Sequence, residues 1–78
     1  MKELLEFIIR NILGESSKFE IEEINEGSLV KLIIKTSEEE GGMVIGKQGK
    51  IIKAIRNILR IKATLEKKKL VLLVNPTE

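Results

Sequence analysis

The sequence predicts a single α+β domain over residues 1–78, with the element order α-β-β-α-α-β. Three observations lead to this prediction: apolar residues recur at helical spacing in 2–13 and 50–62, two strand-like runs flank a turn within 18–36, and a short apolar run occupies 70–74. A hairpin followed by a two-helix crossover to a last strand gives a mixed three-stranded sheet, with the last strand parallel to the second. We therefore expect three helices packed on one face of that sheet.

The first predicted helix covers residues 2–13 and ends at Gly14. Its apolar stripe consists of Leu5, Ile8, Ile9 and Ile12, widened by Leu4, Phe7 and Leu13. A chain this short needs every apolar face for its core. We therefore expect the helix to pack in the core, with both aromatic residues, Phe7 and Phe19, buried; the alternative is a helix that binds a partner.

The next two elements form a predicted β-hairpin. Residues 18–24 alternate between polar and apolar positions, as a half-buried strand does, and residues 25–28 have the composition of a turn. Residues 29–36 form the second strand, in which Val30, Leu32 and Ile34 share one face. This strand is the more apolar of the two, which favours a central place in the sheet.

A short helix is predicted between Ser37 and the glycines that follow Ile45. Ser37 and Glu40 have the spacing of a capping box, with Ser37 as the N-cap. Three adjacent glutamates at 38–40 could also indicate a metal or catalytic cluster. Successive helical residues diverge around the axis, however, so capping is the favoured interpretation.

A stronger helix follows from about residue 50 to residue 62. Its buried stripe is predicted to contain Ile51, Ile52, Ile55, Ile58 and Leu59. Lys53, Arg56, Asn57 and Arg60 lie on another face, at spacings of three and four. Residues 63–68 have the composition of a charged loop, and residues 70–74 form the last strand, which Asn75 and Pro76 close.

The composition excludes several classes of function. The chain has no cysteine and no histidine, which removes disulfides, zinc–thiolate sites and the commonest general base and metal ligand. No apolar run approaches the ~18 residues of a membrane span, and residues 1–3 do not begin a signal peptide. We expect a cytoplasmic protein without cofactor, metal, membrane partner or small-molecule substrate, and not an enzyme.

The charges are divided between the two parts of the chain. Residues 1–45 carry five Lys or Arg and ten Glu, whereas residues 46–78 carry nine Lys or Arg and two Glu. Such a division indicates a surface that faces a polyanion, backed by an acidic one. The alternative is a lysine-rich surface that serves only solubility.

The basic part begins at Gly46, Lys47, Gln48 and Gly49, a turn between two apolar helical segments. Glycines can adopt positive φ and allow a bulky partner to approach the backbone closely. The helix that opens after Gly49 presents unpaired amides and the positive end of its dipole, and Lys47 and Lys50 add full charges. The turn is therefore a candidate phosphate site, although similar turns also join helices for geometric reasons alone. The spacing does not fit a P-loop, which requires four residues between its glycines.

The run from Val44 to Arg56, Val-Ile-Gly-Lys-Gln-Gly-Lys-Ile-Ile-Lys-Ala-Ile-Arg, resembles the Gly-x-x-Gly region of KH domains. With the element order, the resemblance is to a type II KH domain over residues 2–74. It is closest to the small bacterial single-KH RNA-binding proteins of the KhpA family. The resemblance implies that Gly46, Lys47, Gln48 and Gly49 clamp a nucleic-acid backbone, and that Ile45 and Ile52 line an apolar groove for bases.

The resemblance also implies that Lys67, Lys68 and Lys69 lie in or beside the variable loop on the rim of that groove. Together with Lys50, Lys53 and Arg56 on the helix, they complete the predicted RNA-binding residues. The family often has a basic residue before Val-Ile-Gly, where this chain has Met43, so one phosphate contact is missing. With both aromatic residues expected in the core, base stacking is not predicted and sequence preference should be modest.

The implied partner is single-stranded RNA, and the residues do not distinguish it from single-stranded DNA. The resemblance further implies self-association or pairing with a larger KH-containing protein, and a role in post-transcriptional regulation or as an RNA chaperone, linked to the cell envelope. An alternative hypothesis is an adaptor that uses the KH fold mainly for homo- or heterodimerisation, with weak or no RNA binding. The acidic first half and Met43 favour the adaptor, whereas the Gly-Lys-Gln-Gly turn and the basic second half favour RNA.

Overall fold

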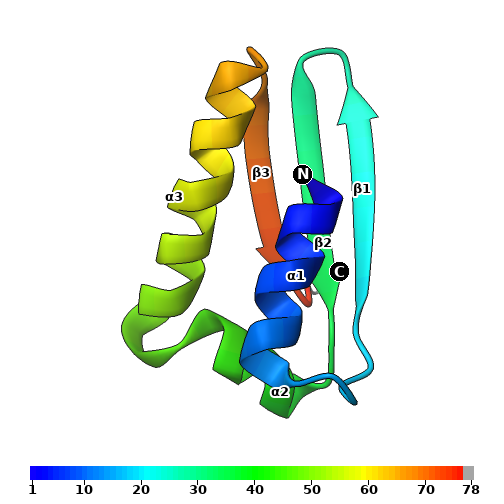
Figure 1. The fold of residues 1–78 in the computed structure, drawn as a ribbon, viewed down its shortest axis with the longest axis vertical. Helices are drawn as coiled ribbons and strands as arrows, with labels where there is room; N and C mark the ends of the chain where they lie inside the picture. Colours follow the sequence, from blue (N-terminus) through cyan, green and yellow to red (C-terminus); the bar gives the residue numbers. More distant parts are fainter. Residues whose placement is uncertain (77–78) are drawn as a thin grey trace.

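The computed structural model describes residues 1–76 and shows the element order that the sequence predicts (Figure 1). The helices and strands are α1 (Lys2–Leu13), β1 (Glu20–Glu26), β2 (Leu29–Lys35), α2 (Glu38–Ile45), η1 (Lys47–Gly49, a single 3-10 turn), α3 (Lys50–Leu65) and β3 (Lys69–Val74).

The sheet has the strand order β1-β2-β3, with β2 at its centre as predicted. β1 pairs antiparallel with β2, from Glu20 opposite Lys35 to Glu26 opposite Leu29. β2 and β3 are parallel, which confirms the predicted crossover and the mixed sheet. The hairpin turn is shorter than the predicted 25–28. Gly27, at φ 58, supplies the positive φ that a two-residue turn needs, so pairing continues to Glu26.

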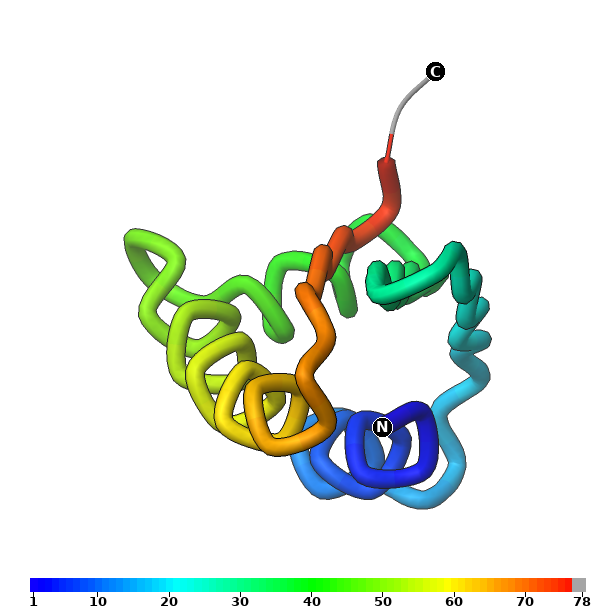
Figure 2. Tube along the Cα trace, turned by 90° about the horizontal axis from the view of Figure 1, so that it is seen from above, coloured from blue at the N-terminus to red at the C-terminus, as the bar shows by residue number. Residues whose placement is uncertain are grey.

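The three helices cover one face of the sheet, as expected. Figure 2 shows α1 and α3 side by side on that face, with the sheet across from them. The core lies between these layers, around the inner face of β2. Its fully buried large side chains are Leu5, Ile9, Val30, Leu32, Ile34, Val44 and Leu59. Within residues 1–76, no helix is both long and apolar enough to cross a membrane.

The prediction that both aromatic residues are buried needs correction for Phe7. Phe7 is 68% exposed, so it is not a core residue. Helical residues advance by about 100° each, and Phe7 lies midway in sequence between Leu5 and Ile9, which places it on the opposite side of α1 from both. Phe19 is partly buried, and the guanidinium of Arg10 lies 5.0 Å from the centre of its ring.

The prediction for α3 was too short and its buried stripe too wide. The helix continues to Leu65, because Ala63 extends the buried series Ile52, Ile55 and Leu59 by one more turn. Residues 63–65 are therefore helical, and only 66–68 form the loop before β3. Ile51 and Ile58, predicted to be buried, are exposed.

The predicted cap of α2 is confirmed. Ser37 is the N-cap residue, and its Oγ accepts a hydrogen bond from the backbone N–H of Glu40 at 3.2 Å. The side chain of Glu40 also accepts a hydrogen bond from Ser17 Oγ, in the segment that connects α1 to β1. The cap therefore ties the start of α2 to that segment.

The burial of α1 predicts different costs for two substitutions on one helix. Leu5→Ala removes a fully buried side chain and should lower the free energy of unfolding by about 2–5 kcal/mol. Phe7→Ala removes a larger but exposed side chain and should cost less than about 1 kcal/mol. Urea unfolding followed by circular dichroism measures both; equal losses would show that α1 is packed by a different face.

Candidate functional site

The turn between α2 and α3 has a backbone that requires its two glycines. Gly46 has φ 77 and ψ 174, a region that is essentially restricted to glycine, and Gly49 is left-handed at φ 72 and ψ 17. A Cβ on Gly46 would lie 2.6 Å from Cγ1 of Ile51, whereas a Cβ on Gly49 would meet nothing closer than 3.9 Å. Gln48, between them, is also left-handed at φ 58, so the tip of this turn holds a strained non-glycine residue. We call residues 46–49 the glycine turn.

The glycine turn presents backbone donors to solvent. The N–H of Gly49 donates to the carbonyl of Gly46 at 3.1 Å, which closes the turn. Among the described residues, the N–H groups of Lys47 and Gln48 have no acceptor. α3 begins directly afterwards, and no side chain caps its N-terminus. Two free amides and the positive end of a sixteen-residue helix thus meet at one place, an arrangement that suits an anion.

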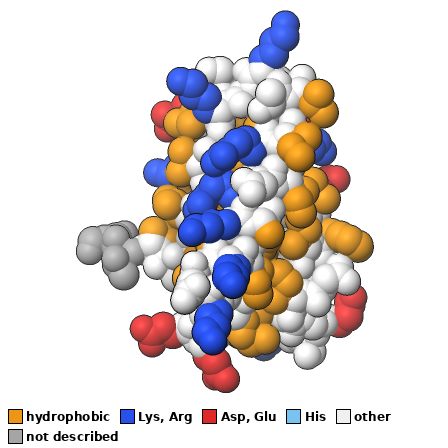
Figure 3. Space-filling view, turned by 90° about the vertical axis from the view of Figure 1, so that its left-hand side faces the viewer, with side chains coloured by type: hydrophobic (Ala, Val, Ile, Leu, Met, Phe, Trp, Pro, Cys, Tyr) orange, Lys and Arg blue, Asp and Glu red, His pale blue; other side chains and the backbone are white. Residues whose placement is uncertain are grey.

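Cationic side chains extend from the turn along one side of α3. Lys47 and Lys50 are exposed at the turn, and Lys53, Arg56 and Arg60 follow at spacings of three and four; we call these last three the cation row. Figure 3, which faces the α3 side of the molecule, shows Lys and Arg side chains gathered in a line beside hydrophobic ones.

Few of these cations are neutralised by the protein itself. Of the nine Lys and Arg in residues 46–78, only Lys68 forms an ion pair within residues 1–76, with Glu66 at 3.9 Å. Exposed pairs of this kind contribute little to stability. The charges of the cation row and of Lys47 and Lys50 therefore remain available to a bound anion.

The predicted rim residues lie at the other end of α3. Lys67 and Lys68 are in the loop after α3, and Lys69 is the first residue of β3. Sixteen residues of helix span about 24 Å at 1.5 Å per residue. Lys67, Lys68 and Lys69 therefore do not meet the glycine turn, but the cation row runs between the two ends.

The two isoleucines predicted to line a groove differ in exposure. Ile45, the last residue of α2, is 39% exposed, directly before the glycine turn. Ile52 is 8% exposed and belongs to the core. Ile45 can therefore contact a ligand at the turn, whereas Ile52 supports the first turn of α3 from below. Met43 is also exposed, on the last turn of α2.

The sequence did not reveal the free edge of β3. β3 is an edge strand, paired only with β2. The N–H groups of Lys69 and Asn75 donate to Ser28 and Ile34 at the β2 edge. Because backbone groups alternate in direction along a strand, those of Leu70, Leu72 and Val74 face the opposite, unpaired edge. Either the odd-numbered or the even-numbered residues of β3 face the free edge, depending on which of them bond to β2. The sequence of β3 alone does not show this.

An exposed apolar stripe on α3 was also missed. The α3 stripe consists of Ile51, Ala54, Ile58, Ile61 and Leu65, and each of these residues is exposed. Ile61 and Leu65 are 65% and 79% exposed. The steps between its members are three, four, three and four residues, which is the spacing of a coiled-coil seam. That spacing was visible in the sequence, but Ile51 and Ile58 were assigned to the core and Leu65 to a loop. A hollow of about 460 Å³, which Ile61 and Leu65 help to line, adjoins the stripe.

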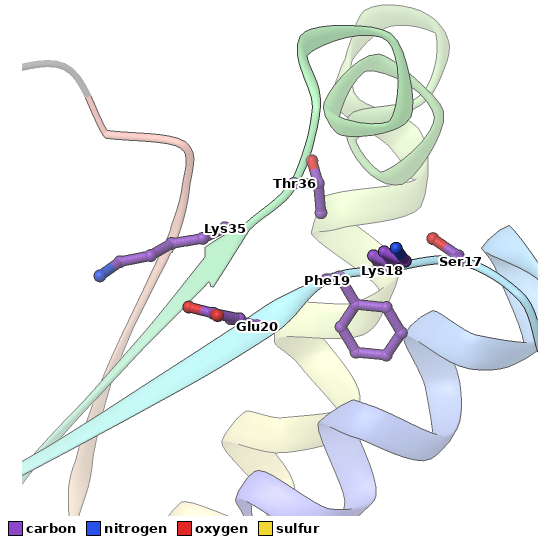
Figure 4. Close-up of a pocket in the computed structure, with 6 residues that line it drawn as sticks. All are labelled: Ser17, Lys18, Phe19, Glu20, Lys35 and Thr36. Atoms are coloured by element: carbon purple, nitrogen blue, oxygen red, sulfur yellow. The ribbon is translucent and has the colours of Figure 1, made fainter.

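A hollow of about 480 Å³ lies elsewhere, where the start of β1 meets the end of β2 (Figure 4). Ser17, Lys18, Phe19, Glu20, Lys35 and Thr36 line it. In Figure 4 the side chains of Lys35 and Glu20 point to one side, and the ring of Phe19 turns towards α1. The polar groups do not converge on one point, so this hollow is a weaker candidate than the glycine turn.

Comparisons with known proteins place the chain among KH-domain proteins. A family model described as the KH domain of KhpA/KhpB matches residues 2–74. The chain is 39% identical over 71 residues to the RNA-binding protein KhpA of Clostridium perfringens, which covers 91% of this chain and 95% of that protein. It is 37% identical, with the same coverage, to the RNA-binding protein KhpA of Clostridium acetobutylicum.

A third relative, the RNA-binding protein KhpA of Thermotoga maritima, is 39% identical over 59 residues, which are 76% of this chain and 79% of that protein. All three relatives are bacterial, in keeping with a bacterial origin of this chain. The resemblance inferred from the glycine turn and the element order is therefore confirmed.

The backbone of the glycine turn predicts unequal effects of two alanine substitutions. Gly46→Ala forces a Cβ against Ile51 in a region that alanine avoids, and should lower the free energy of unfolding by about 2–4 kcal/mol. Gly49→Ala adds a Cβ with no neighbour closer than 3.9 Å, so it should cost only the penalty of the left-handed conformation, about 1 kcal/mol. Urea unfolding compares the two variants; a Gly46→Ala variant as stable as Gly49→Ala would contradict this conformation of the turn.

Proposed function

This chain belongs to the KhpA/KhpB KH-domain family, and from that premise we propose that it is a single KH domain that binds single-stranded RNA through the glycine turn. The family is non-catalytic, so the expectation that the chain is not an enzyme is confirmed by its membership. The proposed setting is the cytoplasm, and the proposed role is post-transcriptional regulation or RNA chaperoning.

The observation that carries the proposal is the meeting of free amides and cations at the glycine turn. The N–H groups of Lys47 and Gln48 have no acceptor within residues 1–76, and the N-terminus of α3 opens beside them. Lys47 and Lys50 carry their charges at the same place. Such a site suits consecutive phosphates of one strand, because backbone donors and the helix dipole contact phosphate oxygens independently of base identity.

We propose a path for the RNA along α3. Its backbone follows the cation row from the glycine turn towards Lys67, Lys68 and Lys69. Its bases face Ile45 and the unpaired backbone groups of Leu70, Leu72 and Val74 at the β3 edge. Phe7 is on α1 and no aromatic residue lies along this path, so base stacking on aromatic rings does not contribute. The names of the relatives favour RNA over single-stranded DNA.

The alternative function, an adaptor that acts by dimerisation, is favoured by one specific observation, the α3 stripe. Its exposed apolar residues have the spacing of a seam between two helices. We propose that it pairs with the α3 stripe of a second copy or with a larger KH-containing protein.

RNA binding at the glycine turn predicts the behaviour of a double variant, Lys47→Asp with Gln48→Asp. Aspartate tolerates the left-handed conformation of Gln48, so the fold should be kept. The two carboxylates would repel phosphates, and RNA affinity should fall at least about tenfold. Fluorescence anisotropy with labelled single-stranded RNA and its DNA equivalent measures this. For the unchanged protein, the logarithm of affinity should fall with that of salt at a slope of about −2 to −3, as for three or four phosphates.

The matched control for this experiment is Lys2→Asp with Asn11→Asp. It changes the net charge by the same amount at two exposed positions of α1. Equal losses in both double variants would mean that net charge, not the turn, governs binding. RNA binding that persists in a folded Lys47→Asp, Gln48→Asp variant would place the site elsewhere.

Self-association through the α3 stripe predicts that Ile61→Glu produces a monomer. Ile61 is mostly exposed in the single chain, so the fold should be retained while a charge enters the apolar seam. Asn11→Glu adds the same charge at an exposed position of α1, away from the stripe, and should leave the association state unchanged. Analytical ultracentrifugation over a range of concentrations compares the three proteins. An unchanged protein that is monomeric throughout would refute pairing between copies, and binding to a larger partner would then be the remaining adaptor hypothesis.

A further inference from the structure

Asn75 follows the last residue of β3 and has an unusual backbone conformation. Its φ is 42, in the left-handed region, which asparagine tolerates better than most residues. Its N–H donates to the carbonyl of Ile34 at 2.8 Å and so continues the pairing of β3 with β2 by one residue. This conformation places the Asn75 side chain over the connection between β2 and α2.

The Asn75 side chain bonds to both residues of that connection. Its Oδ1 accepts a hydrogen bond from the backbone N–H of Thr36 at 2.8 Å. Its Nδ2 donates to Thr36 Oγ1 at 3.2 Å and to the carbonyl of Ser37 at 3.3 Å. Ser37 is the N-cap of α2. One side chain therefore ties the end of β3 to the start of α2, across 39 positions of sequence.

The same side chain packs against the backbone of α2. A Cβ on Gly41 would lie 2.7 Å from Asn75 Nδ2, 3.3 Å from Thr36 Oγ1 and 3.7 Å from Val74 Cγ1. Only glycine allows so close an approach, which gives a physical reason for a residue that weakens an eight-residue helix. We call this contact of Asn75 with Thr36 and Gly41 the latch.

The latch lies between the two parts of the molecule that the proposed RNA path uses. α2 runs from Ser37 through Gly41 to Ile45 and then enters the glycine turn. β3 carries the unpaired backbone groups that face the bases. A change in the angle between α2 and β3 would move the glycine turn relative to the β3 edge, and a strand of RNA must contact both.

We propose that Asn75 is a positioning residue that sets the orientation of α2 against β3 and so holds the glycine turn in place for RNA. This inference rests on the proposed function, because it assigns the latch a purpose in RNA binding. Binding is strongest when the protein does not need to reorganise. The latch would supply that preorganisation although Asn75 is not among the residues proposed to contact RNA.

The test uses Asn75→Gly, since glycine adopts φ 42 without strain and removes only the side chain. The chain has no cysteine, so spin labels can be attached through Gln48→Cys on the turn and Val71→Cys on β3. Without RNA, the distance distribution between the labels should broaden or shift in Asn75→Gly. Ile9→Val removes one methylene from a buried side chain of α1 and serves as the control for a general loss of stability. It should leave the distance distribution unchanged.

Two further measurements complete the test. Gly41→Ala should lower the urea midpoint in the unchanged protein, where its Cβ meets Asn75 Nδ2 at 2.7 Å. It should lower the midpoint much less in the Asn75→Gly background, where Thr36 Oγ1, at 3.3 Å, is the nearest remaining contact. RNA affinity, measured under conditions where every variant is folded, should fall about tenfold in Asn75→Gly and remain unchanged in Ile9→Val.

Three outcomes would overturn the proposal: an unchanged distance distribution in Asn75→Gly, an equal cost of Gly41→Ala in both backgrounds, or an RNA affinity that the loss of the latch leaves unaltered. If the unchanged protein does not bind RNA, the proposed function fails. The distance measurement and the Gly41→Ala comparison then still decide whether Asn75 positions the turn, because neither requires RNA.

Discussion

Burial of β2 is the constraint on which the rest of the molecule depends. β2 is paired on both edges, and Val30, Leu32 and Ile34 are fully buried beneath the helices. A domain of this size buries only about 60% of the surface that its unfolded chain exposes. Each helix must therefore pack on this one inner face, with no second core to support it. The ends of the glycine turn are fixed by that packing, because α2 and α3 each insert side chains into the same layer.

α3 shows how such a small core leaves surfaces free for other contacts. Successive residues turn by about 100° around a helix, so sixteen residues provide three separate sides. Ile52, Ile55 and Leu59 face the core, the cation row lies on one flank, and the α3 stripe lies on the other. RNA binding and self-association would thus use different side chains of one helix. Pairing of two domains would also raise RNA affinity through effective concentration, so the two proposed functions are compatible.

The element order, the sheet and the glycine turn could be predicted from the sequence because each depends on local pattern. Apolar periodicity identifies which residues share a stripe, and Gly46 is required by its own φ and ψ. Periodicity does not show how much of a stripe the rest of the protein can cover, and a three-stranded sheet is narrow. Ile51, Ile58 and Phe7 therefore remained exposed, although all three have apolar side chains at helical spacing.

Tertiary contacts account for what the sequence could not predict. In the sequence, Asn75 before Pro76 indicated only the end of a strand, and nothing identified Asn75 as the residue that approaches Gly41. The contact between Asn75 and Gly41 depends on how β3 packs against α2, and local sequence patterns do not predict that packing. The same holds for the direction of the Leu70, Leu72 and Val74 backbone groups, which follows from pairing with β2.

The low intrinsic stability of α2 explains how a residue that does not contact the glycine turn can influence the position of that turn. Eight residues are too few for a stable isolated helix, and Gly41 and Gly42 each lower its helical propensity further by about 1 kcal/mol relative to alanine. Its conformation must therefore be held from outside, by the Ser37 cap and the latch at its start and by the burial of Val44 near its end. A helix that is stable in isolation would keep its conformation up to the turn without such contacts. A weak helix depends on the contacts that hold it, so the position of the Lys47 and Gln48 amides depends on side chains outside the glycine turn.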